Sequence, residues 1–294
     1  MHNILVTGAD GQLGSEIRTL ASNYNNFNFI FTDVNNLDIT NINDVEEFFT
    51  SHPIDYTINC AAYTAVDKAE TNQETANSIN VTGVKNLVAL SQKYSSKLIH
   101  ISTDYVFDGN NHKPYVETDI TNPVSVYGKT KLEAEQIILN STIKSIIIRT
   151  SWLYSSYGNN FVKTMMRLGS ERDELNVIFD QVGTPTYAFD LAKTILEIIV
   201  LSAKDNNNFK QGIYHFSNQG VCSWYDFAIE IMKFSNINCK INPIESKDYP
   251  TPAKRPFYSV LNKSKIENTF NISIPYWKNS LSQCVKKLSV HSSI

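Results

Sequence analysis

The first fourteen residues place the strongest constraint on how this chain can fold. Residues 4–6 form a short apolar run typical of a buried parallel strand, and three glycines spaced G-x-x-G-x-x-G follow at once, at Gly8, Gly11 and Gly14. An amphipathic run over residues 16–21 then predicts a helix. Strand, glycine turn and helix in this order bring backbone N–H groups and the positive end of a helix together, which is a binding site for a pyrophosphate.

Strands and helices continue to alternate along the chain. Apolar runs predict strands at residues 28–32, 54–59, 97–102, 145–149 and 212–216, and helices at residues 43–50, 75–94, 127–139, 187–202 and 225–234. Such alternation predicts a parallel sheet with helices on both faces and a ligand crevice at the carboxyl ends of the strands. We therefore expect an α/β fold: a Rossmann-type doubly wound parallel sheet in residues 1–150, to which later segments return, and a smaller interleaved C-terminal substrate-binding lobe in residues 151–294.

The composition excludes several classes of partner. A net charge of −3 gives no basic field for nucleic acid or an anionic membrane surface. No segment approaches the roughly 18 apolar residues that a membrane span needs, and Met1 leads almost directly into the first strand, which leaves no room for a signal peptide. The four cysteines are widely spaced with no C-x-x-C pair, so we expect reduced thiols, no metal site and a cytoplasmic protein.

Residues 99–131 carry groups suited to the reduction of a ketone. An apolar strand ends at Thr103, and Tyr127 and Lys131 follow at positions i and i+4 of a predicted helix, so their side chains share one face. A nearby ammonium lowers the pKa of a phenol from its usual value of about 10, and this predicts a coupled acid. The hydroxyl of Thr103 can hold the carbonyl oxygen that Tyr127 protonates. The alternative is an ordinary aromatic residue at a helix start and a solvated lysine.

Charged residues at other loops suggest further contacts. Asp33 follows the second strand about 20 residues after the glycine turn, where a dinucleotide fold has the acid that binds the adenosine ribose. No Arg or Lys follows it through Asp38, so we expect NADH to be accepted. In a proline-rich loop, Arg255 is a candidate for binding a pyrophosphate, although a surface basic pair is an equal alternative. Asp67, by contrast, is predicted to lie in a solvated loop and helix start.

Several longer motifs resemble the extended short-chain dehydrogenase/reductases. They are GADGQLG, CAAYTAVDKAE, STDYVFDG, YGKTKLEAE, RTSWLY, GNNF, DQVGTPT and YPTPAKRP, and together they span nearly the whole chain. The resemblance implies reduction of the C4 ketone of dTDP-4-dehydro-6-deoxy-L-mannose by NADH or NADPH to give dTDP-L-rhamnose. This nucleotide sugar is a donor for cell-envelope polysaccharides such as the O antigen of lipopolysaccharide.

The resemblance also implies roles for individual residues. Thr103, Tyr127 and Lys131 would form the catalytic triad, with Tyr127 the proton donor to the C4 oxygen and Lys131 also bound to the nicotinamide ribose. Further cofactor contacts are implied at Gly8, Gly11, Gln12, Leu13, Asp33, Asp38, Ile39, Ala62, Tyr63, Thr64 and Ile101. Substrate contacts are implied at Thr103, Asp104, Trp152 and Arg255.

Other implications of the resemblance leave alternatives open. Some members are homodimers with a metal ion such as Mg²⁺ between carboxylates that match Glu16 and Asp190, but Asp190 is one carbon shorter than the expected Glu, which argues against the metal and, with it, the dimer. Another nucleotide-sugar 4-keto reductase, an epimerase, or a non-catalytic regulatory subunit could use the same fold. The intact Thr103, Tyr127 and Lys131 favour catalysis.

Overall fold

The protein is described by a computed structural model that covers residues 1–291. Its centre is a six-stranded sheet in the order β10-β5-β4-β3-β1-β2, in which all neighbouring strands are parallel. The strands are β1 (His2–Thr7), β2 (Phe27–Phe31), β3 (Tyr56–Asn59), β4 (Lys97–Thr103), β5 (Ser145–Thr150) and β10 (Gly212–His215). The predicted doubly wound α/β fold is confirmed.

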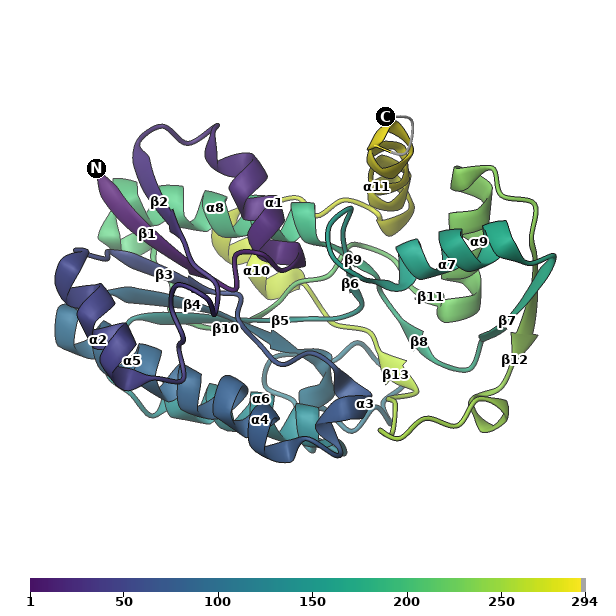
Figure 1. Ribbon diagram of the computed structural model, residues 1–294, viewed down its shortest axis with the longest axis horizontal. Coiled ribbons are helices and arrows are strands. Elements are labelled where there is room, and N and C mark those ends of the chain that lie inside the picture. Colours follow the sequence, from purple (N-terminus) through teal and green to yellow (C-terminus); the bar gives the residue numbers. More distant parts are fainter. Residues whose placement is uncertain (292–294) are drawn as a thin grey trace.

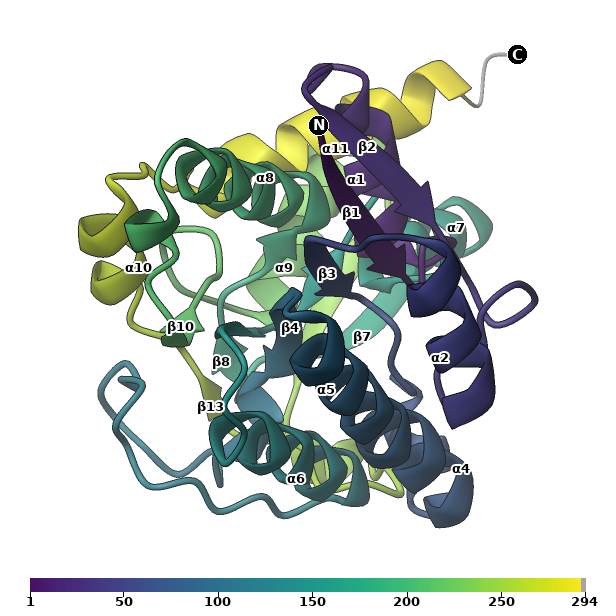
Figure 2. The ribbon, with the colours of Figure 1, turned by 90° about the vertical axis from the view of Figure 1, so that its left-hand side faces the viewer.

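Helices cover both faces of this sheet. Successive residues of each strand point to opposite sides, so an apolar strand presents side chains to both helical layers. In β1, Ile4 and Val6 pack against α1 (Gln12–Ala21) and α8 (Ala188–Lys204). On the opposite face Leu5 packs against two other helices. Figures 1 and 2 show the sheet between the two helical layers. The second layer comprises α2 (Ile42–Ser51), α5 (Gly83–Tyr94) and α6 (Val126–Leu139).

A smaller lobe lies beside the carboxyl ends of these strands (Figure 1). Its core surrounds Phe227 and Trp277 and is separate from the cores of the large sheet. The lobe contains α7 (Phe161–Glu171), α9 (Trp224–Ser235), α11 (Trp277–His291) and the parallel pair β7 (Glu174–Ile178) and β12 (Lys240–Ile244). Short strands connect the two parts: β6 (Leu153–Tyr154), β8 (Val182–Gly183), β9 (Thr186–Tyr187), β11 (Cys222–Ser223) and β13 (Tyr258–Ser259).

Some details differ from the local sequence pattern. The helix predicted at residues 75–94 consists of α4 (Gln73–Asn77), one π-helical turn at Ser78–Thr82, and α5. Both α8 and β10 lie beyond residue 150 yet belong to the large sheet and its helical layers. The remaining helices are α3 (Val66–Ala69) and α10 (Ser264–Phe270). Within residues 1–291, no helix is both long and apolar enough to cross a membrane, and the four cysteines are unpaired.

Candidate active site

The glycine turn leaves no space for side chains. Gly8 has a φ of +61°, and a Cβ atom there would lie 2.6 Å from the backbone nitrogen of Ala61. A Cβ atom on Gly14 would lie 2.5 Å from Cα of Ala9. Gly11 is the N-cap of α1, and no side chain accepts a hydrogen bond at this cap. The first N–H groups of α1 therefore face a space that suits a pyrophosphate.

A cavity of about 500 Å³ begins at this turn and reaches the catalytic candidates. It unites most of the residues for which a role was predicted. Its lining includes Gly8, Gly11, Gln12, Leu13, Cys60, Ala62, Thr64, Ile101, Thr103, Asp104, Tyr127, Lys131 and Trp152. The cavity thus joins the carboxyl ends of β1, β3, β4 and β5 to the first turns of α1 and α6.

Four of the predicted cofactor residues do not line this cavity. Asp33 lies beside the glycine turn, where its carboxylate accepts the N–H of Asp10 at 3.0 Å. Asp38 accepts hydrogen bonds from Thr40, and the side chain of Ile39 is buried in the core formed with α2 and α5. The fourth, Tyr63, has both its backbone N–H and its C=O bonded to the side chain of Asn80.

The first turn of α6 holds Tyr127. Ser125 caps this helix by accepting the N–H of Gly128 at 3.1 Å. Loss of solvation raises the pKa of Tyr127, and a hydrogen bond with Thr103 opposes this rise only in part. The expected fall of the pKa of Tyr127 toward the working range is therefore wrong for this arrangement, because the net shift is upward and burial is its largest cause.

Lys131 is almost fully buried at the wall of this cavity. Its Nζ donates to the carbonyl oxygen of Ile101 at 2.7 Å and lies 3.1 Å from Nε2 of His100. Burial lowers the pKa of Lys131 to about 8, whereas the charge of Glu135 acts in the opposite direction. This amine therefore changes its charge close to the physiological range.

Asp104 provides a second buried ionisable group. Its Oδ1 accepts the hydroxyl proton of Thr103 at 3.0 Å, and Ser259 also favours the carboxylate form through its hydroxyl. Burial raises the pKa of Asp104 to about 6. Thr103 is therefore fixed in orientation by the residue that follows it.

Trp152 separates this cavity from a larger one of about 830 Å³ and contributes to the walls of both. Its φ of +49° lies in the left-handed region, which is strained for a bulky side chain. The indole stacks on Trp224 with ring centroids 3.6 Å apart. On another side it lies against Gly183, where a Cβ atom would come within 2.7 Å of the ring. Packing therefore holds this conformation at the boundary of the two cavities.

Arg255 lines the larger cavity and has definite partners. Its guanidinium forms an ion pair with Asp67, and its Nη1 donates to the hydroxyl of Tyr105 at 3.0 Å. Asp67 lies in the first turn of α3, which agrees with the predicted helix start, but its carboxylate is paired rather than only solvated. Glu70 in the same segment accepts the N–H of Val126 at 2.9 Å. These contacts connect the segment after β3 to both α6 and the proline-rich loop.

The local sequence pattern gave no role to Asn80. This buried residue lies in the π-helical turn, a distortion that is frequent at functional sites. Its Oδ1 accepts the N–H of Tyr63 at 2.8 Å, and its Nδ2 donates to the carbonyl of Tyr63 and to Oγ1 of Thr130. One side chain therefore fixes the cofactor-side loop after β3 against helix α6.

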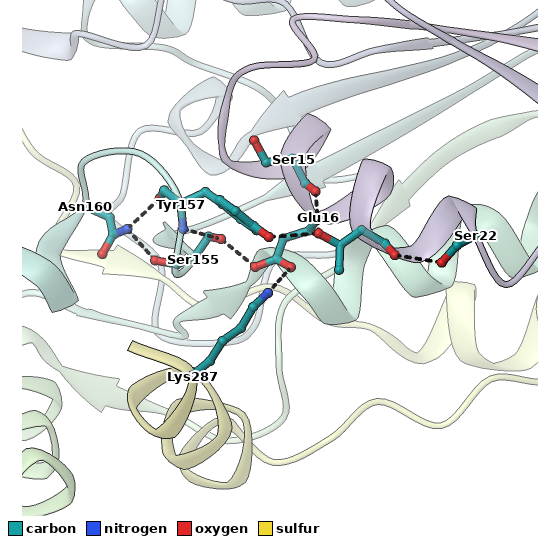
Figure 3. A network of polar contacts seen from close by, with 8 residues as sticks. Ser15, Glu16, Ser22, Ser155, Tyr157, Asn160 and Lys287 are labelled. Atoms are coloured by element: carbon teal, nitrogen blue, oxygen red, sulfur yellow. Dashed lines mark hydrogen bonds and ion pairs between the residues drawn. The ribbon is translucent and has the colours of Figure 1, made fainter. Parts of the chain in front are cut away.

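The carboxylates that would hold a metal ion have other partners here. Glu16 is fully buried, accepts a hydrogen bond from Ser155 at 2.6 Å and pairs with Lys287 at 3.1 Å (Figure 3). Asp190 instead accepts hydrogen bonds from Asn218 and Ser280. Among residues 1–291, no group of three or more His, Cys, Asp and Glu side chains could hold a metal ion. These residues do not fit the implied metal ion.

The fold and the cavity define a class of protein, the extended short-chain dehydrogenase/reductases, in which a glycine turn and a Tyr–Lys pair share one crevice. The chain belongs to the family described as RmlD substrate binding domain, which matches residues 1–290. The dTDP-4-dehydrorhamnose reductase of Aggregatibacter actinomycetemcomitans is 43% identical, and the match covers 96% of this chain and 97% of that protein.

Solved structures give the same result. A crystal structure of a dTDP-4-dehydrorhamnose reductase from Clostridium acetobutylicum is 46% identical with a TM-score of 0.92, over 98% of this chain and 99% of that one. The dTDP-4-dehydrorhamnose reductase of Bacillus anthracis, in complex with NADP, is 37% identical with a TM-score of 0.92, over 97% of this chain and 99% of that one. The resemblance seen in the sequence motifs is confirmed.

Proposed function

We propose that this chain reduces the C4 ketone of dTDP-4-dehydro-6-deoxy-L-mannose with NADH or NADPH and releases dTDP-L-rhamnose, the final step of dTDP-rhamnose biosynthesis. The observation that carries this proposal is the single cavity that joins the glycine turn to Thr103, Tyr127 and Lys131. Similarity along the whole chain to dTDP-4-dehydrorhamnose reductases supports the substrate and the reaction. The NADP complex of the Bacillus anthracis relative supports the cofactor.

The proposed chemistry assigns proton transfer to the protein. When bound, a reduced nicotinamide supplies the hydride that adds to C4. Tyr127 donates its phenolic proton to the C4 oxygen, and because its pKa is raised it is in the acid form at neutral pH. Thr103 orients the same oxygen by donating its hydroxyl proton to it, and for this the hydroxyl must turn away from Asp104, to which it donates in this structure. Lys131 binds the nicotinamide ribose.

The remaining residues bind and orient the two ligands. Gly8, Gly11, Gln12 and Leu13 contact the pyrophosphate at the N-terminus of α1, and Asp33 contacts the adenosine ribose. Asp38 and Ile39 lie at the adenine, and Ala62, Thr64 and Ile101 lie along the nicotinamide half. Tyr63 contributes less than the sequence implied, since Asn80 already bonds its backbone.

The smaller lobe, which shares residues 151–294 with segments that return to the large sheet, is proposed to bind the nucleotide sugar. Its larger cavity adjoins the catalytic one at Tyr105 and Trp152. Asp104 and Trp152 contact the sugar, and Arg255 contacts the diphosphate, for which a planar guanidinium is well suited. A diphosphate at Arg255 would compete with Asp67 for the same N–H donors.

We also infer a cytoplasmic location and action as a homodimer. Four unpaired cysteines and a nucleotide-sugar substrate support the location. The homodimer follows from the resemblance alone, and light scattering of the purified protein tests it.

The function is tested by the loss of absorbance from NADH and NADPH while dTDP-4-dehydro-6-deoxy-L-mannose is generated in the same tube. Stoichiometric oxidation with dTDP-L-rhamnose as the product supports the proposal. An epimerase would give a product without net oxidation. Tight cofactor binding with no oxidation would contradict the proposal and favour a regulatory role.

The variant Tyr127→Phe tests the proton donor. Turnover should fall by about 10²- to 10⁴-fold, with cofactor affinity nearly unchanged, because only the acid is removed. Tyr94→Phe is the matched control, since its hydroxyl bonds to Thr50 at 2.7 Å and Tyr94 does not line the cavity. Near-normal turnover in Tyr127→Phe would contradict the assignment of Tyr127 as the proton donor.

A further inference from the structure

A row of buried polar side chains crosses the sheet next to the proposed active site. Thr7 on β1, Asn59 on β3 and His100 on β4 are register partners in three neighbouring strands, so their side chains lie on one face. Lys131 of α6 completes the row. None of these four residues is more than 1% exposed, so their polar atoms depend on one another for hydrogen bonds.

The orientation of Asn59 follows from its neighbours. Its Oδ1 lies 3.2 Å from the backbone nitrogen of Ala61 and 2.7 Å from the hydroxyl of Thr7. A backbone N–H can only donate, so the atom that faces it must be the amide oxygen. The Nδ2 of Asn59 is thereby directed at Nδ1 of His100, 3.0 Å away. Because an amide nitrogen can also only donate, Nδ1 of His100 is the nitrogen without a proton.

This result fixes the tautomer of His100. Burial and the nearby Lys131 hold the pKa of His100 well below its usual value of 6.5, so the ring is neutral and carries one proton. That proton must be on Nε2, which lies 3.1 Å from Nζ of Lys131. An N–H group directed at a neutral amine forms a hydrogen bond, whereas the same N–H directed at an ammonium is repelled.

We infer that Asn59 and His100 form a one-directional hydrogen-bond chain that favours the neutral amine of Lys131, so that His100 is a positioning residue that sets the pH at which Lys131 loses its charge. The chain runs from Asn59 through His100 to Lys131, which in turn donates to the carbonyl of Ile101. This inference rests on the proposed function only where turnover is measured.

The other ionisable groups around Lys131 do not replace this effect. Burial raises the pKa of Cys60 on β3 to about 12, so the thiol is neutral. Glu135, one turn further along α6, favours the ammonium, but it is already paired with Arg149 of β5 at 2.7 Å. Two further ionisable residues line the same cavity as Lys131: Tyr127, one turn earlier on α6, and Asp104, directly after β4. Among the described residues, only His100 and the carbonyl of Ile101 lie at hydrogen-bond distance from Nζ.

The tautomer is measured directly on the full chain by long-range ¹H–¹⁵N correlation of ¹⁵N-labelled histidine rings. His215 is an internal reference of the opposite kind, because its Nδ1 lies 3.0 Å from the carbonyl oxygen of Tyr115, which can only accept. We expect a neutral Nε2–H ring at His100 and a neutral Nδ1–H ring at His215. His100→Gln and His215→Gln assign the two signals. An Nδ1–H tautomer or a charged ring at His100 would overturn the inference.

The effect on Lys131 is measured by NMR titration of ¹³C-labelled lysine side chains and by the pH profile of kcat/KM. Glutamine at position 100 can present an oxygen to the ammonium, so the titration of Lys131 should move upward by about one pH unit in His100→Gln. His215→Gln, also a buried histidine of this sheet, should leave it unchanged.

An unchanged Lys131 titration in His100→Gln would contradict the inference. The titration needs no enzymatic activity, so a failure of the proposed function would appear as absent turnover with the lysine shift still present. If His100→Gln does not fold, glutamine variants of the other five histidines assign their own signals and identify that of His100 by elimination, so the wild-type spectrum still decides the tautomer.

Discussion

The ammonium of Lys287 lies 3.1 Å from a carboxylate oxygen of Glu16, and this ion pair attaches α11 to the helix that follows the glycine turn (Figure 3). Lys287→Met should lower the free energy of unfolding by about 2–4 kcal/mol, because Glu16 is fully buried and would keep an uncompensated charge. Urea unfolding monitored by circular dichroism measures the change. The neighbouring, exposed Lys286→Met is the matched control, and equal stability of the two variants would contradict the prediction.

Asp104 should make the protein less stable at neutral pH. Its pKa is raised to about 6 in the folded chain from an ordinary value of 3.8, so between these values the folded state holds a proton that the unfolded state has lost. Stability therefore falls as pH rises through this window and stays reduced above it. Asp104→Asn should be more stable than the wild type by about 3 kcal/mol at neutral pH, and the gain should vanish below about pH 4.

The control for this prediction has the opposite sign. Hydrogen bonds from the backbone of Asn110 and from Tyr115 lower the pKa of Asp108. Asp108→Asn should therefore lose stability at neutral pH and approach the wild type in acid. Urea unfolding at several pH values distinguishes the two variants. A destabilised Asp104→Asn protein at neutral pH would show that the hydrogen bonds to the carboxylate, from Thr103 and Ser259, outweigh the cost of its burial.

Much of the fold could be predicted because parallel strands leave short apolar runs and the glycine spacing marks the first crossover. The meeting of Thr103, Tyr127 and Lys131 at one cavity could also be predicted, since strand ends share an edge and positions i and i+4 share a helix face. The residues that contact these three side chains were harder to predict from the sequence. His100 stands inside an apolar run and reads as an ordinary strand residue, although its ring contacts Lys131.

Pairs of side chains that are far apart in the chain leave no pattern in the sequence around either residue. The ion pair of Asp67 and Arg255 joins segments that are far apart in the chain, so each residue reads as a surface charge. The π-helical turn at Asn80 depends on partners in two other segments, Tyr63 and Thr130. The pKa of Tyr127 was predicted in the wrong direction because the extent of burial cannot be judged from spacing alone.

Arg18 should allow the protein to use NADPH despite Asp33. The sequence after Asp33 offers no cation, but Arg18 of α1 bonds to the carboxylate of Asp10 at 3.0 Å and lies over the ring of Phe31 at the end of β2. The N–H of Asp10 in turn bonds to Asp33, so a guanidinium is available beside the ribose-binding acid. Arg18→Met should lower kcat/KM for NADPH by about tenfold and change that for NADH little.

The reciprocal variant is Asp33→Ala, which should raise the ratio of NADPH to NADH use because a repulsive charge is lost. Initial rates with both cofactors measure each ratio. Equal effects of Arg18→Met on NADH and NADPH would show that Arg18 does not reach the 2′-phosphate. An unchanged ratio in Asp33→Ala would show that Asp33 does not face the ribose.

Arg255→Met should weaken binding of the nucleotide sugar without changing the chemical step. The guanidinium lines the larger cavity and is held by Asp67 and Tyr105. Loss of a charge-assisted contact to a diphosphate should raise KM by about 10- to 100-fold with kcat nearly unchanged. Lys254→Met, the adjacent and exposed cation, should leave both constants near those of the wild type. A fall in kcat with KM unchanged would instead mean that Arg255 acts on the reacting sugar. Its ion pair with Asp67 would then help to position residues of the catalytic cavity.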